Sequence, residues 1–200
     1  MARYTGPTVK QSRREGFALT DKAQKYLDRR PYPPGEHGRG RIRQSEYLLQ
    51  LREKQKTRRF YGLLEKQFRR YYEKANRQQG ITGENLLRML EMRLDNVVYR
   101  LGFAATRRQA RQLVNHGHFR VNGAKVDIPS YQVKANDVIT VKQGSSAEPI
   151  IRAATELVAS VAPWLQADYD ALNGKVLKAP ERSEIDTPVS EQLIVEYYSK

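Results

Sequence analysis

The chain has 200 residues, a formal net charge of +14, a pI of about 10.0 and no cysteine. This charge is typical of a nucleic-acid binder, because basic side chains that neutralise phosphates release counterions. The lack of cysteine excludes disulfides, a thiol nucleophile and cysteine-based zinc sites. The sequence contains no apolar run long enough for a membrane span and no signal-peptide core, so we expect a cytoplasmic protein without a membrane partner.

The charge is uneven along the chain. Residues 1–145 carry the whole positive excess, whereas residues 146–200 contain 5 basic and 9 acidic side chains. We therefore expect the first three quarters to build a surface for RNA and the last quarter to face another protein.

Residues 1–45 predict a basic arm rather than a domain. Prolines and glycines argue against long helices. The arm has few periodic apolar residues and can bury little surface by itself, so we expect it to order against RNA. Its tyrosines can stack on bases, although loop packing explains each of them equally well. The candidate RNA contacts of the arm are Arg3, Tyr4, Lys10, Arg13, Arg14, Arg39, Arg41 and Arg43.

Residues 46–91 predict the first part of a helical body. Ser45 is suited to cap a helix that begins at Glu46, and Gly62 predicts a break into two helices. Aromatic residues recur here at helical spacing, which favours core positions. Thr82 predicts the start of a shorter helix. The candidate phosphate contacts, with a solvated helix face as the alternative, are Arg52, Lys54, Lys56, Arg58, Arg59, Arg69 and Arg70.

Residues 92–143 predict a compact unit of two helices and a small sheet. Apolar residues at i, i+3, i+4 and i+7 from Leu94 indicate a first helix, which Gly102 ends. Thr106 and Gln109 fit a capping box at the start of a second helix. Strands are expected on both sides of a tight turn at residues 122–123 and after a second turn at residues 136–137.

The second predicted helix of this unit carries its chemistry. Arg107, Arg108 and Arg111 lie on its first turns, where exposed backbone amides also favour phosphate oxygens. No carboxylate lies between Arg100 and Arg120 to neutralise them. A solvated charged face is the alternative, and we favour RNA contact.

Residues 144–200 predict the second part of the helical body. We expect a helix over 150–161, a short strand over 174–179 and a last helix opened by the Thr187-Pro188 pair. Trp164 and Leu165 are expected to fill the helical body. The predicted fold class is α+β, a mainly helical body with an inserted RNA-binding domain and an extended basic N-terminal arm.

The unit at 92–143 resembles the alpha-L RNA-binding domain, with Phe119 where that family often has a small aliphatic residue. This module also occurs in pseudouridine synthases, a class of tRNA synthetase and a heat-shock protein. The motifs that carry the resemblance are Arg93-Leu94-Asp95, Arg100-Leu101-Gly102, Thr106-Arg107, Ala110-Arg111 and Val121-Asn122-Gly123.

The whole chain is similar to the bacterial-type S-four family of small-subunit ribosomal proteins. Several blocks occur in the order of that family, which makes this resemblance far more specific than the alpha-L module alone. The blocks are Arg3-Tyr4, Gly6-Pro7, Ser12-Arg13-Arg14-Glu15-Gly16, Pro34-Gly35-Glu36-His37-Gly38, Leu51-Arg52-Glu53-Lys54-Gln55-Lys56, Gly83-Glu84-Asn85 and Ile194-Val195-Glu196-Tyr197-Tyr198-Ser199-Lys200.

This resemblance implies a structural role in the ribosome. Members of the family bind small-subunit ribosomal RNA early, at a five-helix junction of its 5′ domain, and organise the body of the subunit. They contact the S-five protein at an interface tied to decoding accuracy, and they line the path by which messenger RNA enters. By position, Arg39, Arg41 and Arg43 are similar to the family's basic residues near that path, and the terminal helix with its acidic flank to its protein-facing side.

We expect no cofactor and no metal. Some family members hold zinc with cysteines in the arm, and His37 alone does not replace such a site. His116 and His118 form a pair without an evident third ligand, so we predict hairpin packing or RNA contact for them rather than metal binding.

Two other functions fit a basic chain with an alpha-L module. An RNA-modifying enzyme needs a catalytic domain, but the flanks are short and basic, and no phosphate-binding loop or hydrolase motif occurs. A free RNA chaperone or heat-shock factor would bind loosely and tolerate any sequence. We predict a ribosomal protein, not an enzyme, and keep the chaperone as the alternative.

Overall fold

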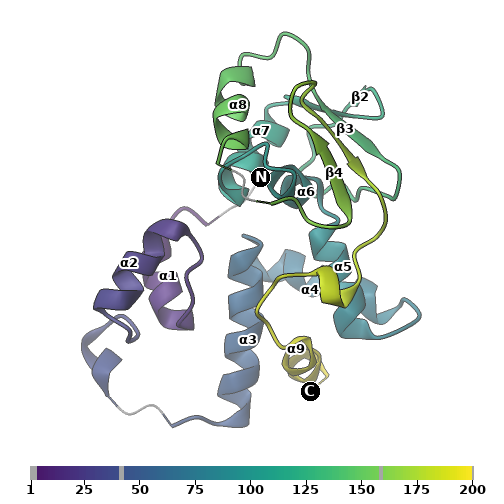
Figure 1. Cartoon of the computed structure of the whole chain (residues 1–200). Coiled ribbons are helices and arrows are strands. Elements are labelled where there is room, and N and C mark those ends of the chain that lie inside the picture. The colour runs from purple at the N-terminus through teal and green to yellow at the C-terminus, as the bar shows by residue number, and fades with distance from the viewer. Residues whose placement is uncertain (1–3, 41–42, 158–159, 200) are drawn as a thin grey trace. The chain divides into compact units, whose positions relative to one another are not determined.

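The computed structural model describes residues 4–40, 43–157 and 160–199 (Figure 1). The chain divides into two compact units, Met1–Gly83 with Thr187–Lys200, and Glu84–Asp186. We call them the split unit and the central unit. Within the described ranges, every helix is too short or too polar to cross a membrane.

The split unit is helical. Its elements are α1 (Thr8–Glu15), α2 (Asp21–Arg29), the 3-10 helix η1 (Glu36–Arg39), α3 (Glu46–Phe60), α4 (Glu65–Asn76), the start of α5 (Thr82–Glu91), and α9 (Glu191–Tyr198). The Ser45 hydroxyl accepts a hydrogen bond from the Leu48 amide at 3.3 Å, which confirms the predicted cap of α3. Gly62 has a φ of +66° between α3 and α4, so the predicted break is also confirmed.

The N-terminal arm is more ordered than its composition predicts. Helices α1 and α2 bury Ser12 and Ala23 completely. The rings of Phe17 and Phe60 lie 6.1 Å apart, which joins the arm to the end of α3. The arm has small side chains and few apolar neighbours in sequence, so its hydrophobic pattern indicates helices only weakly. The packing of the arm on α3 was therefore not predictable from periodicity.

The last helix begins later than we expected. Thr187 is buried, and its hydroxyl lies 3.0 Å from the Tyr61 hydroxyl. The chain is therefore fixed against the α3–α4 connection at this point, and α9 begins only at Glu191. From there α9 packs against α3 and buries Ile194 completely (Figure 1).

The central unit combines helices with one antiparallel sheet, which confirms the α+β class. It holds the rest of α5, then α6 (Leu94–Arg100), α7 (Arg107–Asn115), β1 (Phe119–Val121), β2 (Ala124–Lys125), β3 (Val138–Val141), α8 (Glu148–Thr155), β4 (Leu165–Asp168), β5 (Asn173–Val176) and the 3-10 helix η2 (Arg182–Glu184). The sheet of the described residues has the order β2-β1-β3-β5-β4. The predicted turns are confirmed by positive φ at Asn122, Gly123 and Asn136.

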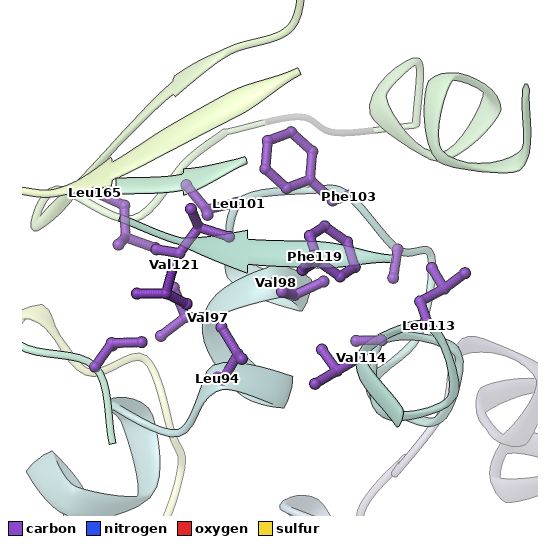
Figure 2. Close-up of a cluster of buried hydrophobic side chains, with 14 of the residues drawn as sticks. Leu94, Val97, Val98, Leu101, Phe103, Leu113, Val114, Phe119, Val121 and Leu165 are labelled. Atoms are coloured by element: carbon purple, nitrogen blue, oxygen red, sulfur yellow. The ribbon is translucent and has the colours of Figure 1, made fainter. Parts of the chain in front are cut away.

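The core of the central unit lies between α6, α7 and one face of the sheet. Figure 2 shows Val97 and Val98 of α6 and Val114 of α7 directed toward Phe119 and the strands. The rings of Phe103 and Phe119 are stacked at 6.1 Å. This core fixes the two helices against the sheet and so positions the start of α7.

Two expectations for the second flank were wrong. Trp164 and Leu165 fill the core of the central unit, not the helical body, because β4 and β5 extend its sheet. The helix expected over 150–161 is α8, which ends at Thr155. Leu157, just beyond that end, is 75% exposed, so its side chain gives a longer helix no support from the core.

Candidate nucleic-acid interface

The start of α7 is capped as the sequence predicts, with one shift. The Thr106 hydroxyl accepts a hydrogen bond from the Gln109 amide at 3.2 Å. The Gln109 side chain reaches back to the amide of Ala105 at 2.9 Å instead of that of Thr106. Two amides at the N-terminus are thus satisfied, and the helix presents its basic first turn in a fixed geometry.

Arg107 is held by its neighbours rather than left in solvent. Its Nε donates to Asn96 Oδ1 at 2.8 Å, and its guanidinium lies over the Tyr99 ring at 4.4 Å. Arg111 is half-buried one turn further on, whereas Arg108 is exposed. The helix therefore combines one oriented guanidinium with one fully accessible cation.

A buried polar chain lies behind Arg107. Asn96 is 2% exposed, and its amide nitrogen donates to the Glu91 carboxylate at 2.7 Å and to the Glu91 carbonyl at 3.0 Å. The same carboxylate accepts two hydrogen bonds from Arg100, at 2.9 and 3.1 Å. Asn96 thus links the Glu91–Arg100 ion pair to Arg107. Sequence reasoning missed Asn96, and its only signal was a polar residue inside an otherwise apolar helix.

The start of α6 is anchored by a second buried pair. Arg93 is 1% exposed and makes a bidentate contact with Asp95, at 3.0 and 2.6 Å. The amides of Leu94 and Asp95 donate to carbonyls of residues 131 and 129. The resemblance motif at 93–95 is therefore structural, because it fixes the chain to the segment before β3.

His118 has an internal partner, whereas His116 is exposed. His118 Nδ1 lies 2.8 Å from the Ser145 hydroxyl. Burial, then the neighbouring His116 and Lys142, lower the pKa of His118 below its usual range. The described residues contain no group of three or more potential metal ligands.

The predicted cations of α3 are largely paired within the protein. Arg52 contacts the buried Glu15 carboxylate at 3.1 Å, and Arg59 contacts the same oxygen. Lys56 pairs with Glu53 at 2.8 Å. These carboxylates leave less charge for an RNA than the sequence indicates, since Glu15 lies far from α3 in the chain.

Lys54 and Arg58 form a second internal cluster around Glu65. Lys54 is only 3% exposed, and its ammonium lies 2.9 Å from Glu65 and 4.5 Å from the centre of the Tyr197 ring. Arg58 donates to Gln55 at 2.6 and 3.0 Å and lies 3.7 Å from Glu65. A side chain as buried as Lys54 is not available to a phosphate in this conformation.

Glu15 shows the electrostatic cost of this arrangement. Burial raises the pKa of its carboxyl group, and the charges of Arg52 and Arg59 oppose that rise. Its second oxygen has no hydrogen-bond partner among the described residues. Glu15 therefore depends on its two arginines to remain in the interface between α1 and α3.

In the arm, arginines hold the proline-rich turn. Arg13 Nε donates to the carbonyls of Arg30 and Tyr32 at 3.3 and 3.2 Å, and Arg14 donates to that of Pro34 at 3.2 Å. Arg13 and Arg39 both lie about 5 Å from the centre of the Tyr32 ring. Arg13 and Arg14 thus have internal hydrogen bonds, and a contact with RNA would have to keep or replace them.

The remaining predicted contacts that the structure describes lie at the surface. Arg3 and Arg41 fall outside the described residues. Arg69 is exposed and pairs with Glu73 at 3.2 Å. The others are exposed side chains: Tyr4, Lys10, Arg43, Arg70 and His116.

Comparison with known proteins agrees with this geometry. Residues 3–91 match the family described as ribosomal protein S4/S9 N-terminal domain, and residues 92–139 match the S4 domain. The chain is similar to the small ribosomal subunit proteins uS4 of Nocardia farcinica (60% identity over 202 residues), Nocardioides sp. (61% over 202) and Rubrobacter xylanophilus (56% over 200). Each alignment covers 100% of both chains.

The chain belongs to the uS4 family of small ribosomal subunit proteins. The predicted bacterial-type family and its RNA-binding S4 domain are therefore confirmed. A uS4 protein is a structural constituent of the ribosome, so the expectation that the chain is not an enzyme is also confirmed. In this uS4 family member the S4 domain match, residues 92–139, contains α6, α7 and β1 to the start of β3, and the rest of the sheet lies beyond it.

Proposed function

We propose that the chain is a primary binder of small-subunit ribosomal RNA that recognises the five-helix junction of the 5′ domain. By binding that junction early, it nucleates assembly of the subunit body. It works as a cytoplasmic ribosomal component that supports translational accuracy and borders the path of incoming messenger RNA. Its neighbours include the S-five protein.

The start of α7 is the observation that carries this proposal. Arg107 is fixed by Asn96 and Tyr99 at a capped helix N-terminus, and no carboxylate occurs from residue 101 to residue 119. A preoriented guanidinium binds a phosphate with less loss of side-chain entropy than a mobile one. Such an anchor favours one folded RNA over RNA in general.

We divide the predicted contacts into two groups. We assign direct RNA contact to residues of the arm, of α4, of α7 and of the segment that follows α7: Arg3, Tyr4, Lys10, Arg39, Arg41, Arg43, Arg69, Arg70, Arg107, Arg108, Arg111, His116 and His118. We assign support of the RNA-binding surface to the cations of α1 and α3 that hydrogen bonds or ion pairs hold within the split unit: Arg13, Arg14, Arg52, Lys54, Lys56, Arg58 and Arg59.

We also propose a division of labour along the chain. The arm (1–45) and the first helical part (46–91) contact RNA, the alpha-L domain (92–143) supplies the oriented site, and the acidic residues 144–200 face protein. Within the arm, the exposed Arg39 and Arg43 lie toward messenger RNA. The net negative charge of the last quarter suits a basic neighbouring protein.

Affinity across a salt series tests the proposal. The full chain is measured against the 5′-domain RNA of the small subunit and an unrelated structured RNA, together with the double variant Arg107→Glu, Arg111→Glu. We expect a large preference for the 5′-domain RNA that persists at physiological salt, and a weaker affinity and flatter salt dependence for the variant. Equal affinities that collapse together with salt would favour a free RNA chaperone, and an unchanged variant would remove α7 from the site.

A further inference from the structure

The face of the sheet that points away from α6 and α7 carries exposed cations. Alternation along β1 buries Phe119 and Val121 and leaves Arg120 exposed on the opposite face. Register extends this face, because Arg120 is directly opposite Lys125 and Thr140, and Lys175 is directly opposite Val138 and Gln166. We call this surface the outer sheet face, with Arg120, Lys125, Lys142 and Lys175 as its cations.

Lys142 joins this face one residue beyond β3. Val141 packs against the core, and the Lys142 amide donates to the His118 carbonyl at 2.8 Å, so the strand pairing continues. Lys142 and His118 therefore lie side by side. The stem of Lys125 crosses Gly117, where an added Cβ would lie 2.6 Å from Lys125 Cε. That close approach fixes part of the lysine side chain.

The charges on this face are poorly compensated. Lys125 lies 3.7 Å from Asp127, an exposed contact of little strength. Asp168 points to the same face and keeps its negative charge, although its carboxylate also accepts the amides of Asp170 and Ala171 at 3.1 Å. Two carboxylates, Asp127 and Asp168, therefore lie near four cations. Arg120 and Lys125 are like charges directly across a strand pair, which destabilises a sheet unless an anion lies between them.

We propose that the outer sheet face binds the sugar-phosphate backbone of a second RNA segment, separate from the segment at α7. This inference rests on the proposed function, which places the chain against a large folded RNA. The charge pattern favours RNA, because its phosphates offer several adjacent anions to cations on neighbouring strands. No Phe, Tyr or Trp of the described strands points to this face, so the face is suited to contact the sugar-phosphate backbone of the RNA rather than to stack on its bases.

The two RNA segments are distinct because the two sites face opposite sides of the sheet. The core between the helices and the strands separates α7 from the outer sheet face (Figure 2). One short duplex cannot contact both without bending around the edge of the sheet. The central unit thus clamps a folded RNA from two sides instead of docking on one strand.

The test uses the full chain and two variants with the same loss of charge. Arg120→Gln with Lys175→Gln removes two cations from the outer sheet face. Arg152→Gln with Lys178→Gln is the matched control, because both of its cations already pair with carboxylates, Glu148 for Arg152 and Glu181 and Glu184 for Lys178. Affinity for the 5′-domain RNA is measured from low to physiological salt, and hydroxyl-radical protection of the RNA is recorded for each protein.

We expect the outer-face variant to lose about tenfold or more in affinity at physiological salt and about two in the slope of log affinity against log salt. The control should change neither by a comparable amount. In the protection experiment, the outer-face variant should lose one patch of nucleotides, and Arg107→Glu with Arg111→Glu should lose a different one.

Two results would overturn the inference. If the outer-face variant matched its control in affinity and slope, the face would not bind RNA and would be left to an acidic protein. If it lost the same nucleotides as the α7 variant, there would be no second segment. Failure of the proposed function looks different, since the wild-type chain would then show no preference for the 5′-domain RNA.

Discussion

At the scale of single residues, orientation matters as much as charge. In the sequence nothing distinguishes Arg107 from the other arginines. In the structure its Nε donates a hydrogen bond to Asn96, which in turn donates one to Glu91. Asn96 is only 2% exposed, so we expect it to act on a bound RNA through Arg107 rather than by direct contact. It is therefore a positioning residue, whose loss should disturb recognition without changing the number of cations.

Replacement of Asn96 by alanine tests this role. The change removes the hydrogen bonds that Asn96 makes with Glu91 and with Arg107, so we expect a loss of about 1–3 kcal/mol in the free energy of unfolding. Affinity for the 5′-domain RNA should fall several-fold while the salt slope stays unchanged. Denaturant unfolding and the salt series measure both, and Tyr99→Phe, which keeps the ring under Arg107, is the control. A slope reduced by about one would mean that Arg107 has lost its phosphate altogether.

At the scale of elements, Glu65 links three helices. Its carboxylate accepts hydrogen bonds from Lys54 of α3 at 2.9 Å and Tyr198 of α9 at 2.7 Å, and it lies on the first turn of α4. Burial alone would raise the pKa of Glu65, but the bonds from Tyr198 and Lys54 and the nearby charges outweigh it and lower the pKa. The contacts of Glu65 with α3 and α9 therefore stabilise the split unit most when Glu65 is ionised.

This lowered pKa predicts a pH dependence of stability. Because the folded pKa lies below the ordinary value of 4.5, the stabilising contribution is complete above that value and is lost as pH falls through the folded pKa. Glu65→Gln should be less stable than the wild type at pH 6, by up to about 1 kcal/mol because the carboxylate is partly exposed. The difference should vanish at the lowest pH. Thermal midpoints of both proteins from pH 6 to pH 3 measure it, and a constant difference would contradict the assignment.

The limits of prediction at this scale follow from sequence separation. The caps of α3 and α7 and the turn at Asn122 depend on neighbouring residues, and all three were predicted. The pairing of β5 with β3 joins segments more than thirty residues apart. No local pattern therefore indicated the strands that Leu165 packs with, and its packing was predicted wrongly. Glu15 and Arg52 are also far apart in the sequence, so their ion pair was not predicted. The positive charge that α3 offers to RNA was therefore predicted too high.

At the scale of the whole molecule, charge and specific geometry belong to different units. The split unit contains 22 basic and 10 acidic residues, whereas the central unit contains 14 and 12. The central unit nevertheless holds the oriented Arg107 and a core of its own. On the proposed function, we therefore expect long-range attraction to RNA to come mainly from the split unit and the fixed contacts to come from the central one.

Excision of the central unit separates these two contributions. A fragment of residues 84–186 keeps its whole sheet and core, so we expect it to fold with a single cooperative thermal transition. With a net charge of +2 instead of +14, it should bind the 5′-domain RNA about a hundredfold more weakly than the full chain and with a much smaller salt slope. Its preference for that RNA over an unrelated one should nevertheless persist, because Arg107 and its supports are intact. The control is the fragment with Asn96→Ala, which should lose that preference. A fragment that bound both RNAs equally would place the specificity in the split unit instead.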